Sequence, residues 1–422
     1  MKASTSPGAS YGRAARGVSS LQLTGTGRKI IVLAATSALV LAGCSGATPQ
    51  TRSAASGGPA PKAAVLPPRP STDTVGSRDP RPTHASMPAA VAANLRHGVF
   101  VWLPYWNMPA ALDSTLANSG VVGTASPFWY AISGDSTIEE NPGAGEQSII
   151  DELRGRGIHV VPTVTETDGI RDFDRMLASA SRRAAMVRAL VRIASSRDYS
   201  GLDLDFEDFA VDRDHNVALA DTAAARYPAF VGEVCGALHA IGRGCSVTVM
   251  PRTTSGKMYW RGLLATWVFD YRALAKVADR VQIMAYDEHA PGGAPGPIAP
   301  YEWVEQVIAY ASSVMLIDKA ELALPAYGYD WSGQNASAIT SREAPQLARQ
   351  NRVPPIWNAA QGEDTFSYNA DGRWHKVWYE GATAVYDRAR LAAAAGFGGI
   401  GLWAAGDEDP ALWPMLRALY AG

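Results

Sequence analysis

Short apolar segments alternate with longer helical segments from His97 onward. Each apolar segment is about five residues long and ends in polar or aromatic residues, and a helical stretch usually follows it. Such alternation is typical of βαβ units and of a parallel sheet. The predicted strands are Val99–Leu103, Val121–Phe128, His159–Val164, Leu202–Phe206, Ser246–Met250, Val281–Ala285, Leu322–Ala326 and Ile400–Trp403. The predicted helices include Arg171–Ser195, Ala218–Ile241 and Tyr301–Ser313.

Eight strands predict an α/β fold, a (β/α)8 TIM barrel over residues 96–422. An open doubly wound sheet would give the same alternation. The strand ends favour the barrel, because Tyr105, Trp106, Glu207, Tyr286 and Trp403 would then converge on one mouth, where active sites lie. No glycine-rich phosphate loop follows the first strand, so no dinucleotide site is predicted, and no cofactor is expected.

One connection is too long for a simple crossover. The segment between Ala326 and Ile400 is rich in Trp and Tyr and contains turn signals such as residues 369–372. We expect a small α+β insertion between strands 7 and 8, at about residues 329–381, that forms a wall beside the mouth. The alternative is a loop with a satellite core of its own.

The N-terminal region predicts export rather than a membrane span. Basic residues precede an apolar run of 11 residues, Ile30–Val40, whereas a span needs about 20. The following Leu-Ala-Gly-Cys resembles a bacterial lipobox, which implies a signal peptide at residues 1–43 and lipidation of Cys44. The alternative is ordinary secretion, and the long stretch before Arg28 leaves open a later translation start, for instance at Val18.

Residues 44–95 are rich in Ala, Pro and Ser and predict a disordered tether. The expected location is therefore the outer face of the cell membrane, with the protein held by a lipid anchor and facing the cell wall.

The two remaining cysteines, Cys235 and Cys245, could form a disulfide in an exported protein, or they could be two separate buried thiols. Three scattered cysteines support no metal site. The net charge is −2 and no polybasic segment is present, so nucleic acid is not an expected partner. We expect a monomer. The 12 Trp and 16 Tyr are compatible with stacking on sugar rings, although large domains also bury aromatic residues.

Residues 201–209, GLDLDFEDF, carry the clearest chemical signal. On a strand, Asp203, Asp205 and Glu207 share one face, with neighbours about 6.5 to 7 Å apart. Like charges at that spacing raise the pKa of at least one acid where solvation is poor. The alternative is an edge strand with a solvated acidic face, but the other face is wholly apolar.

These residues resemble the strand-four signature of glycoside hydrolase family 18, the chitinase-like family. Residues 284–287 resemble its strand-six motif, and residues 399–403 resemble its final strand. Residues 269–271, 285–289 and 325–331 resemble the subgroup of spore cortex-lytic and germination glycosidases. The resemblance covers residues 98–416. Ser200 and Phe206 depart from the usual strand-four pattern, and the third strand lacks the small residues of typical chitinases.

The resemblance implies a retaining glycosidase in which the substrate's acetamido oxygen, and no second carboxylate, attacks the sugar. Glu207 would be the general acid, Asp205 would orient the acetamido group, and Asp203 would share a proton with Asp205. Tyr286 would bond the acetamido oxygen and Trp403 would form the floor under the sugar. Tyr105 and Asp287 are predicted substrate contacts, and Trp106, Trp129 and Trp331 are predicted stacking platforms; for each aromatic residue, ordinary packing is the alternative.

The expected substrate is an N-acetylglucosamine-containing polysaccharide, either peptidoglycan or chitin. Two other classes compete with the glycosidase. The first is a non-catalytic carbohydrate-binding barrel, which would usually lack the acid at Glu207. The second is a metal-dependent hydrolase, which is disfavoured because no histidines lie near the three acids and the strand spaces them widely.

Overall fold

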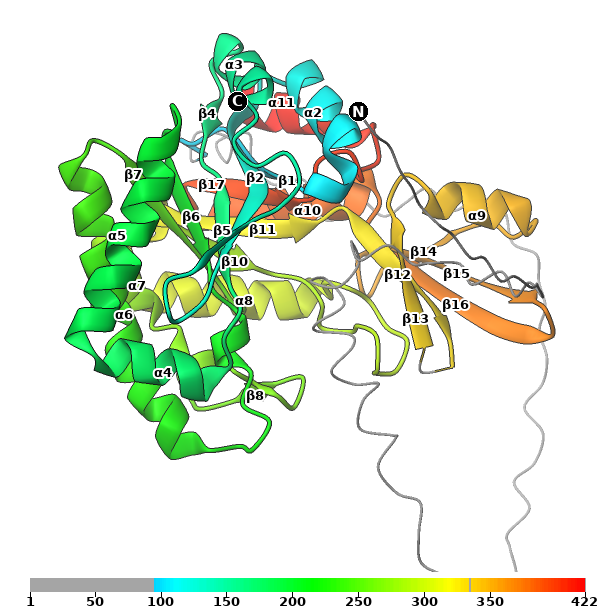
Figure 1. Cartoon of the computed structure of the whole chain (residues 1–422). Coiled ribbons are helices and arrows are strands. Elements are labelled where there is room, and N and C mark those ends of the chain that lie inside the picture. The colour runs from blue at the N-terminus through cyan, green and yellow to red at the C-terminus, as the bar shows by residue number, and fades with distance from the viewer. Residues whose placement is uncertain (1–94, 334, 422) are drawn as a thin grey trace, which may run out of the picture. The chain divides into compact units, whose positions relative to one another are not determined.

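The computed structural model describes residues 95–333 and 335–421, and Figure 1 shows the arrangement of their helices and strands. The predictions for residues 1–43, Cys44 and the tether to residue 94 lie outside the described residues. Within the described ranges, no helix is long and apolar enough to cross a membrane.

Eight parallel strands form a closed barrel. Each strand pairs with the next, and β1 pairs with both β2 and β17, so the sheet has no open edge at that point. The closure confirms the TIM barrel and excludes the open doubly wound sheet. In barrel order the strands are β1 (Val99–Leu103), β2 (Val122–Ile132), β5 (Thr163–Glu166), β6 (Gly201–Asp205), β7 (Gly244–Val249), β10 (Arg280–Met284), β11 (Ala320–Pro325) and β17 (Gly399–Trp403).

Four short strands accompany the barrel. They are β3 (Ile138–Glu140), β4 (His159–Val160), β8 (Tyr259–Trp260) and β9 (Leu264–Ala265). The predicted third strand is interrupted at Val161 and Pro162, so it appears as β4 followed by β5. Proline has no N–H to donate to a ladder, which accounts for the break.

Helices surround the barrel, as expected for the fold. They are α2 (Met108–Ala117), α3 (Gln147–Gly155), α4 (Ile170–Ala178), α5 (Ala180–Ser196), α6 (Val217–Ala240), α7 (Tyr271–Val277), α8 (Tyr301–Val314), α10 (Ala382–Ala395) and α11 (Leu412–Ala421). The prediction of one helix at 171–195 is wrong. Ser179 is extended there and its side chain accepts a hydrogen bond from the Arg182 N–H, so it ends α4 and caps α5.

The residues between β11 and α10 form a separate antiparallel sheet (Figure 1). Its order is β13 (Asn335–Thr340), β12 (Tyr327–Ser332), β16 (Arg373–Tyr379), β15 (Glu363–Ala370) and β14 (Ile356–Asn358). Helix α9 (Ala344–Gln350) packs through Ala344 and Ala348 on one face, against Phe366, Tyr368 and Val377. The segment therefore has a core of its own, and its first strand begins two residues before the predicted boundary.

A buried ionic network joins this insertion to the barrel. Arg388 of α10 is wholly buried, and its Nη2 lies 3.5 Å from Glu363 Oε1 and 3.3 Å from Glu380 Oε1. Glu363 also accepts the N–H groups of Ile298 and Ala299, at 2.8 and 2.7 Å. Burial raises the pKa of Glu380 well above its usual range, and the charge of Arg388 opposes this rise.

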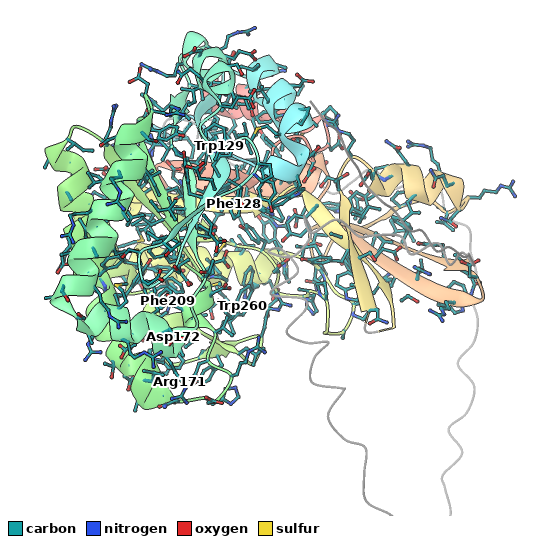
Figure 2. The ribbon with its side chains drawn as sticks, viewed as in Figure 1. Phe128, Trp129, Arg171, Asp172, Phe209 and Trp260 are labelled. Atoms are coloured by element: carbon teal, nitrogen blue, oxygen red, sulfur yellow. A yellow bond between two sulfur atoms is a disulfide. The ribbon has the colours of Figure 1, made fainter. Side chains whose placement is uncertain are left out.

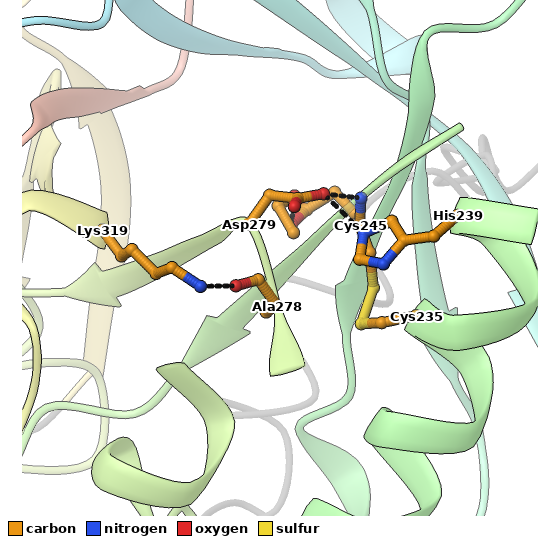
Figure 3. The surroundings of a disulfide bond; sticks show 8 residues. Cys235, His239, Cys245, Ala278, Asp279 and Lys319 are labelled. Atoms are coloured by element: carbon orange, nitrogen blue, oxygen red, sulfur yellow. Dashed lines mark hydrogen bonds and ion pairs between the residues drawn. A yellow bond between two sulfur atoms is a disulfide. The ribbon is translucent and has the colours of Figure 1, made fainter. Parts of the chain in front are cut away.

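Cys235 of α6 and Cys245 of β7 form a disulfide rather than two separate thiols (Figure 3). The Asp279 carboxylate beside it accepts the Cys245 N–H at 2.8 Å, and His239 Nε2 lies 3.0 Å from the same carboxylate oxygen. Nearby, Lys319 Nζ donates to the Ala278 carbonyl at 2.8 Å. The disulfide and the contact of His239 with Asp279 join α6 to the amino ends of β7 and β10, opposite the end that carries Glu207.

Candidate active site

Strand β6 carries the acids into the interior of the barrel. Asp203 and Asp205 point inward, whereas Phe206 points outward and packs on Phe173 and Phe230 with ring centroids 5.7 and 6.4 Å apart. The strand ends at Asp205, and Glu207 has φ −114° and ψ −39°, so the chain turns there. Figure 2 shows the surrounding side chains and labels Phe209, which follows this turn.

Asp203 is fully buried and accepts hydrogen bonds from four side chains of neighbouring strands. The donors are Ser246 Oγ at 2.7 Å, Thr248 Oγ1 at 3.1 Å, Trp102 Nε1 at 3.2 Å and Thr163 Oγ1 at 3.3 Å. Burial raises the pKa of Asp203, and the four donors oppose this rise. Asp203 is thus a fixed acid at the base of the site.

Asp205 is hydrogen-bonded to Glu207, and no hydrogen bond joins it to Asp203 among the described residues. The reason is geometric. Donors already occupy both oxygens of Asp203, whereas the turn at Glu207 brings the longer side chain back toward Asp205. The sharing of a proton between Asp203 and Asp205 stays a prediction. The Asp205 Oδ1 atom is buried and has no hydrogen-bond partner among the described residues.

The Asp205–Glu207 pair retains a proton above neutral pH. Burial, followed by the charges of Glu207 and Asp203, raises the pKa of Asp205 well above its usual range. Burial, followed by the charge of Asp208, raises the pKa of Glu207 to about 8, and the hydrogen bond from Asp205 opposes this rise. Two carboxyl groups joined by a hydrogen bond titrate as a pair, and the raised pKa of Glu207 keeps a proton on the pair at pH 7.

Tyr286 and Asp287 follow β10 and face the same acids. Tyr286 is 8% exposed, and burial, followed by the charges of Glu207 and Asp205, raises its pKa. Its hydroxyl therefore remains a neutral donor. Asp287 has a left-handed φ of 65° and accepts hydrogen bonds from Tyr327 and Tyr329. The charge of Asp287 contributes to the raised pKa of Glu207.

An aromatic cluster lies at the ends of β17 and β1. Trp403 is half-buried, and its ring centroid lies 5.4 Å from that of Phe128, 6.1 Å from Trp102 and 6.3 Å from Trp106. Tyr105 and Trp106 are also half-buried, with centroids 4.9 Å apart. These three residues keep surface that a ligand could reach. Figure 2 labels Phe128 and Trp129 on β2.

Two predicted stacking platforms are not available. Trp331 is 1% exposed and packs edge-on against Tyr329 at 5.4 Å. Trp129 is fully buried and packs against Tyr199 at 6.2 Å. Neither ring offers a face to a sugar, so the predicted stacking role is wrong for both. The reason is that each lies within a strand, Trp129 in β2 and Trp331 in β12, and is packed among other residues.

Sequence reasoning overlooked one buried acid near the site. Glu166, at the end of β5, is 3% exposed and accepts the N–H groups of Phe209 and Asp168, at 2.5 and 2.8 Å. Burial, followed by the charge of Asp208, raises its pKa. Glu166 thus ties the third strand to the turn that carries Glu207. The only signal in the sequence was an acid two residues after the predicted third strand, which ends at Val164.

The described residues contain no group of three His, Cys, Asp or Glu side chains arranged to hold a metal ion. An inward-facing acid pair at the end of a TIM-barrel strand, with one proton held above neutral pH, is suited to protonating a glycosidic oxygen. The fold and the site define a glycosidase, and comparison with known proteins gives the family.

The chain belongs to glycosyl hydrolases family 18, because residues 132–409 match the sequence pattern of that family. This confirms the family inferred from the strand motifs. A curated relative, the uncharacterized glycosylase YvbX of Bacillus subtilis (strain 168), is 32% identical over 261 residues, which cover 59% of this chain and 71% of that protein. The cortical fragment-lytic enzyme of Bacillus anthracis is 33% identical over 181 residues, or 40% of each chain.

A solved structure with the same fold is that of a chitinase from Chromobacterium violaceum ATCC 12472. Its TM-score is 0.68 at 29% identity, and the match covers 77% of this chain and 99% of that one. The chain is therefore similar both to a chitinase and to glycosylases of the spore cortex-lytic group.

Proposed function

We propose that this glycosidase is a retaining enzyme that cleaves β-linked N-acetylglucosamine polymers by substrate-assisted catalysis. The observation that carries the proposal is the Asp205–Glu207 pair, in which burial and neighbouring charge raise the pKa of Glu207 to about 8. An acid with that pKa is protonated at pH 7 and can donate to a leaving oxygen.

In the first step, Glu207 gives its proton to the glycosidic oxygen while the bond from that oxygen to C1 of the sugar breaks. The acetamido carbonyl oxygen forms a new bond to C1, which produces an oxazolinium ion, and the leaving sugar departs with a free hydroxyl. In the second step, water adds to C1 as the bond from C1 to the acetamido oxygen breaks, and Glu207 takes the proton of the water. Two displacements at C1 retain its configuration.

Asp205 is proposed to bind the acetamido N–H through Oδ1, the buried oxygen that lacks a partner. A donor at Asp205 favours its charged form, so the shared proton moves to Glu207 when the substrate binds. The Asp205 charge then stabilises the positive charge of the oxazolinium ion. Asp203 holds this region of the strand fixed and contributes negative charge.

The remaining residues are proposed to position the sugar. Tyr286, a neutral donor beside the acids, bonds the acetamido oxygen. Trp403 provides the floor under the reacting ring, and Tyr105 and Trp106 contact neighbouring sugars through their exposed surface. Aromatic faces suit the apolar faces of sugar rings.

The polymer is proposed to be peptidoglycan or chitin, and a parallel digestion distinguishes them. Purified peptidoglycan and chitin oligomers are incubated with the protein, and mass spectrometry identifies the products. We expect fragments that end in reducing N-acetylglucosamine from at least one polymer. The Glu207→Gln variant should lose at least about 100-fold in rate, whereas Glu152→Gln, an exposed residue of α3, should match the parent. A Glu207→Gln variant as fast as the parent would refute the proposal.

A further inference from the structure

The Tyr-Gly-Tyr-Asp-Trp segment, residues 327–331, opens the insertion, and the mechanism above does not use it. Both of its tyrosine hydroxyls donate to one carboxylate, that of Asp287. Tyr327 lies 2.6 Å from Asp287 Oδ1, and Tyr329 lies 3.0 Å from Oδ1 and 3.2 Å from Oδ2. All three residues are at most 9% exposed.

Strand β16 and neighbouring aromatic rings hold the two tyrosines in place. Gly328 between them lies so close to β16 that an added Cβ would stand 2.1 Å from the Trp378 carbonyl oxygen, so only glycine permits this strand pairing. The rings of Tyr327 and Tyr329 pack edge-on at 5.5 Å, and the buried Trp331 packs on Tyr329 at 5.4 Å. On the other side, Tyr327 packs on Tyr286 at 6.2 Å.

Asp287 therefore lies between the insertion and the active site. Arg261, in the turn between β8 and β9, places Nη1 3.8 Å from Asp287 Oδ2, and Glu207 is a carboxyl group whose pKa the charge of Asp287 raises. The next residue, Glu288, is directed elsewhere and accepts Trp260 Nε1 at 3.1 Å. Two hydroxyl donors and one arginine all favour the charged form of Asp287.

We propose that Tyr327 and Tyr329 are positioning residues that hold Asp287 in its charged form beside Glu207, so that the insertion helps to set the protonation state of the general acid. This inference rests on the proposed role of Glu207. Burial raises the pKa of Asp287, whereas Arg261 and the two hydroxyls lower it. The charge of Asp287 in turn raises the pKa of Glu207.

The sign of the expected effect follows from these contacts. Without the hydroxyls, Asp287 binds a proton at higher pH, because the charged form loses its donors. The active form, with Asp287 charged and Glu207 protonated, then exists only at higher pH. The acidic limb of the plot of activity against pH therefore moves to higher pH.

The test compares Tyr327→Phe, Tyr329→Phe and the double variant with the parent. The pH dependence of kcat/KM is measured on an N-acetylglucosamine oligomer with a chromogenic leaving group. We expect the acidic limb of the double variant to move up by about half a pH unit or more. The control is Tyr368→Phe, which removes a similar hydroxyl that bonds Asp330 within the same insertion, and its profile should match the parent.

A second measurement does not depend on activity. In the Glu207→Gln background, carbon-13 NMR of labelled aspartate follows the titration of the Asp287 carboxyl. We expect it to titrate at higher pH once the two hydroxyls are removed, while Tyr368→Phe leaves it unchanged. Thermal unfolding of each variant monitors the fold.

An Asp287 titration that is the same with and without the hydroxyls would overturn the inference. So would a uniform loss of activity with unmoved limbs, which would assign the tyrosines a packing role alone. If the parent cleaves no N-acetylglucosamine substrate, the proposed function fails, and the NMR titration still decides whether the tyrosines control the charge of Asp287.

Discussion

The acid pair Asp205 and Glu207 shows what a residue pattern can predict and where it stops. Period-two alternation placed three carboxylates on one face, because side chains on a strand point alternately to its two sides. The pattern could not show that Trp102, Thr163, Ser246 and Thr248 occupy the oxygens of Asp203. Those donors come from other strands, so the hydrogen-bond partners of each acid depend on the register of the closed barrel.

Asp208 gives a prediction at this scale. Its charge is, after burial, the largest cause of the raised pKa of Glu207. Glu207 acts as an acid when protonated, so activity is present below its pKa and is lost as the pH rises through about 8. Asp208→Asn removes the repulsion and should move the basic limb of kcat down by about half to one pH unit.

The control for this prediction is Asp113→Asn, an exposed residue of α2. Its pH profile should match the parent. If the basic limb of Asp208→Asn stays where the parent's limb lies, Asp208 does not tune Glu207.

At the scale of elements, the strands were predicted well because buried parallel strands form short apolar runs. The predicted β1 has the observed bounds, and the other barrel strands differ by a few residues. The α4–α5 boundary was missed, since the periodicity continues across Ser179 and only the capping geometry reveals the break. The burial of Trp331 was also missed, because the sequence pattern of an aromatic residue near a strand end is the same whether its side chain is packed or exposed.

Arg388 carries a prediction for the join between the insertion and the barrel. Arg388→Met leaves Glu363 and Glu380 buried without their cation, which should lower the free energy of unfolding by roughly 3 to 5 kcal/mol. Urea unfolding measures the loss. Arg390→Met, in the same helix but only partly buried, is the matched control and should cost less than about 1 kcal/mol. Equal losses in the two variants would contradict the role given to the network.

At the scale of the whole molecule, the barrel, the insertion and the family were all accessible from the sequence, because the strand-end motifs recur in a fixed order. The N-terminal predictions concern residues outside the described ranges, and they remain proposals. We propose that Cys44 is lipidated and that the chain is exported to the outer face of the cell membrane, with the predicted tether joining anchor and barrel.

The anchor prediction is tested by cell fractionation of the full chain. The parent should enter the membrane fraction, and Cys44→Ser should leave it, since the acyl chains provide the attachment. Cys235→Ser, which removes a cysteine of the folded part, should not release the protein. A Cys44→Ser protein that stays in the membrane fraction would refute lipid anchoring at this residue.

The central claim is that the substrate's acetamido group attacks C1 after Glu207 donates its proton. Proton NMR of the first product formed from an N-acetylglucosamine oligomer tests this most directly, because it records the configuration at C1 before mutarotation. The account predicts that the β anomer forms first, and that an oligomer lacking the N-acetyl groups is not cleaved. First formation of the α anomer, or equal cleavage of the deacetylated oligomer, would contradict it.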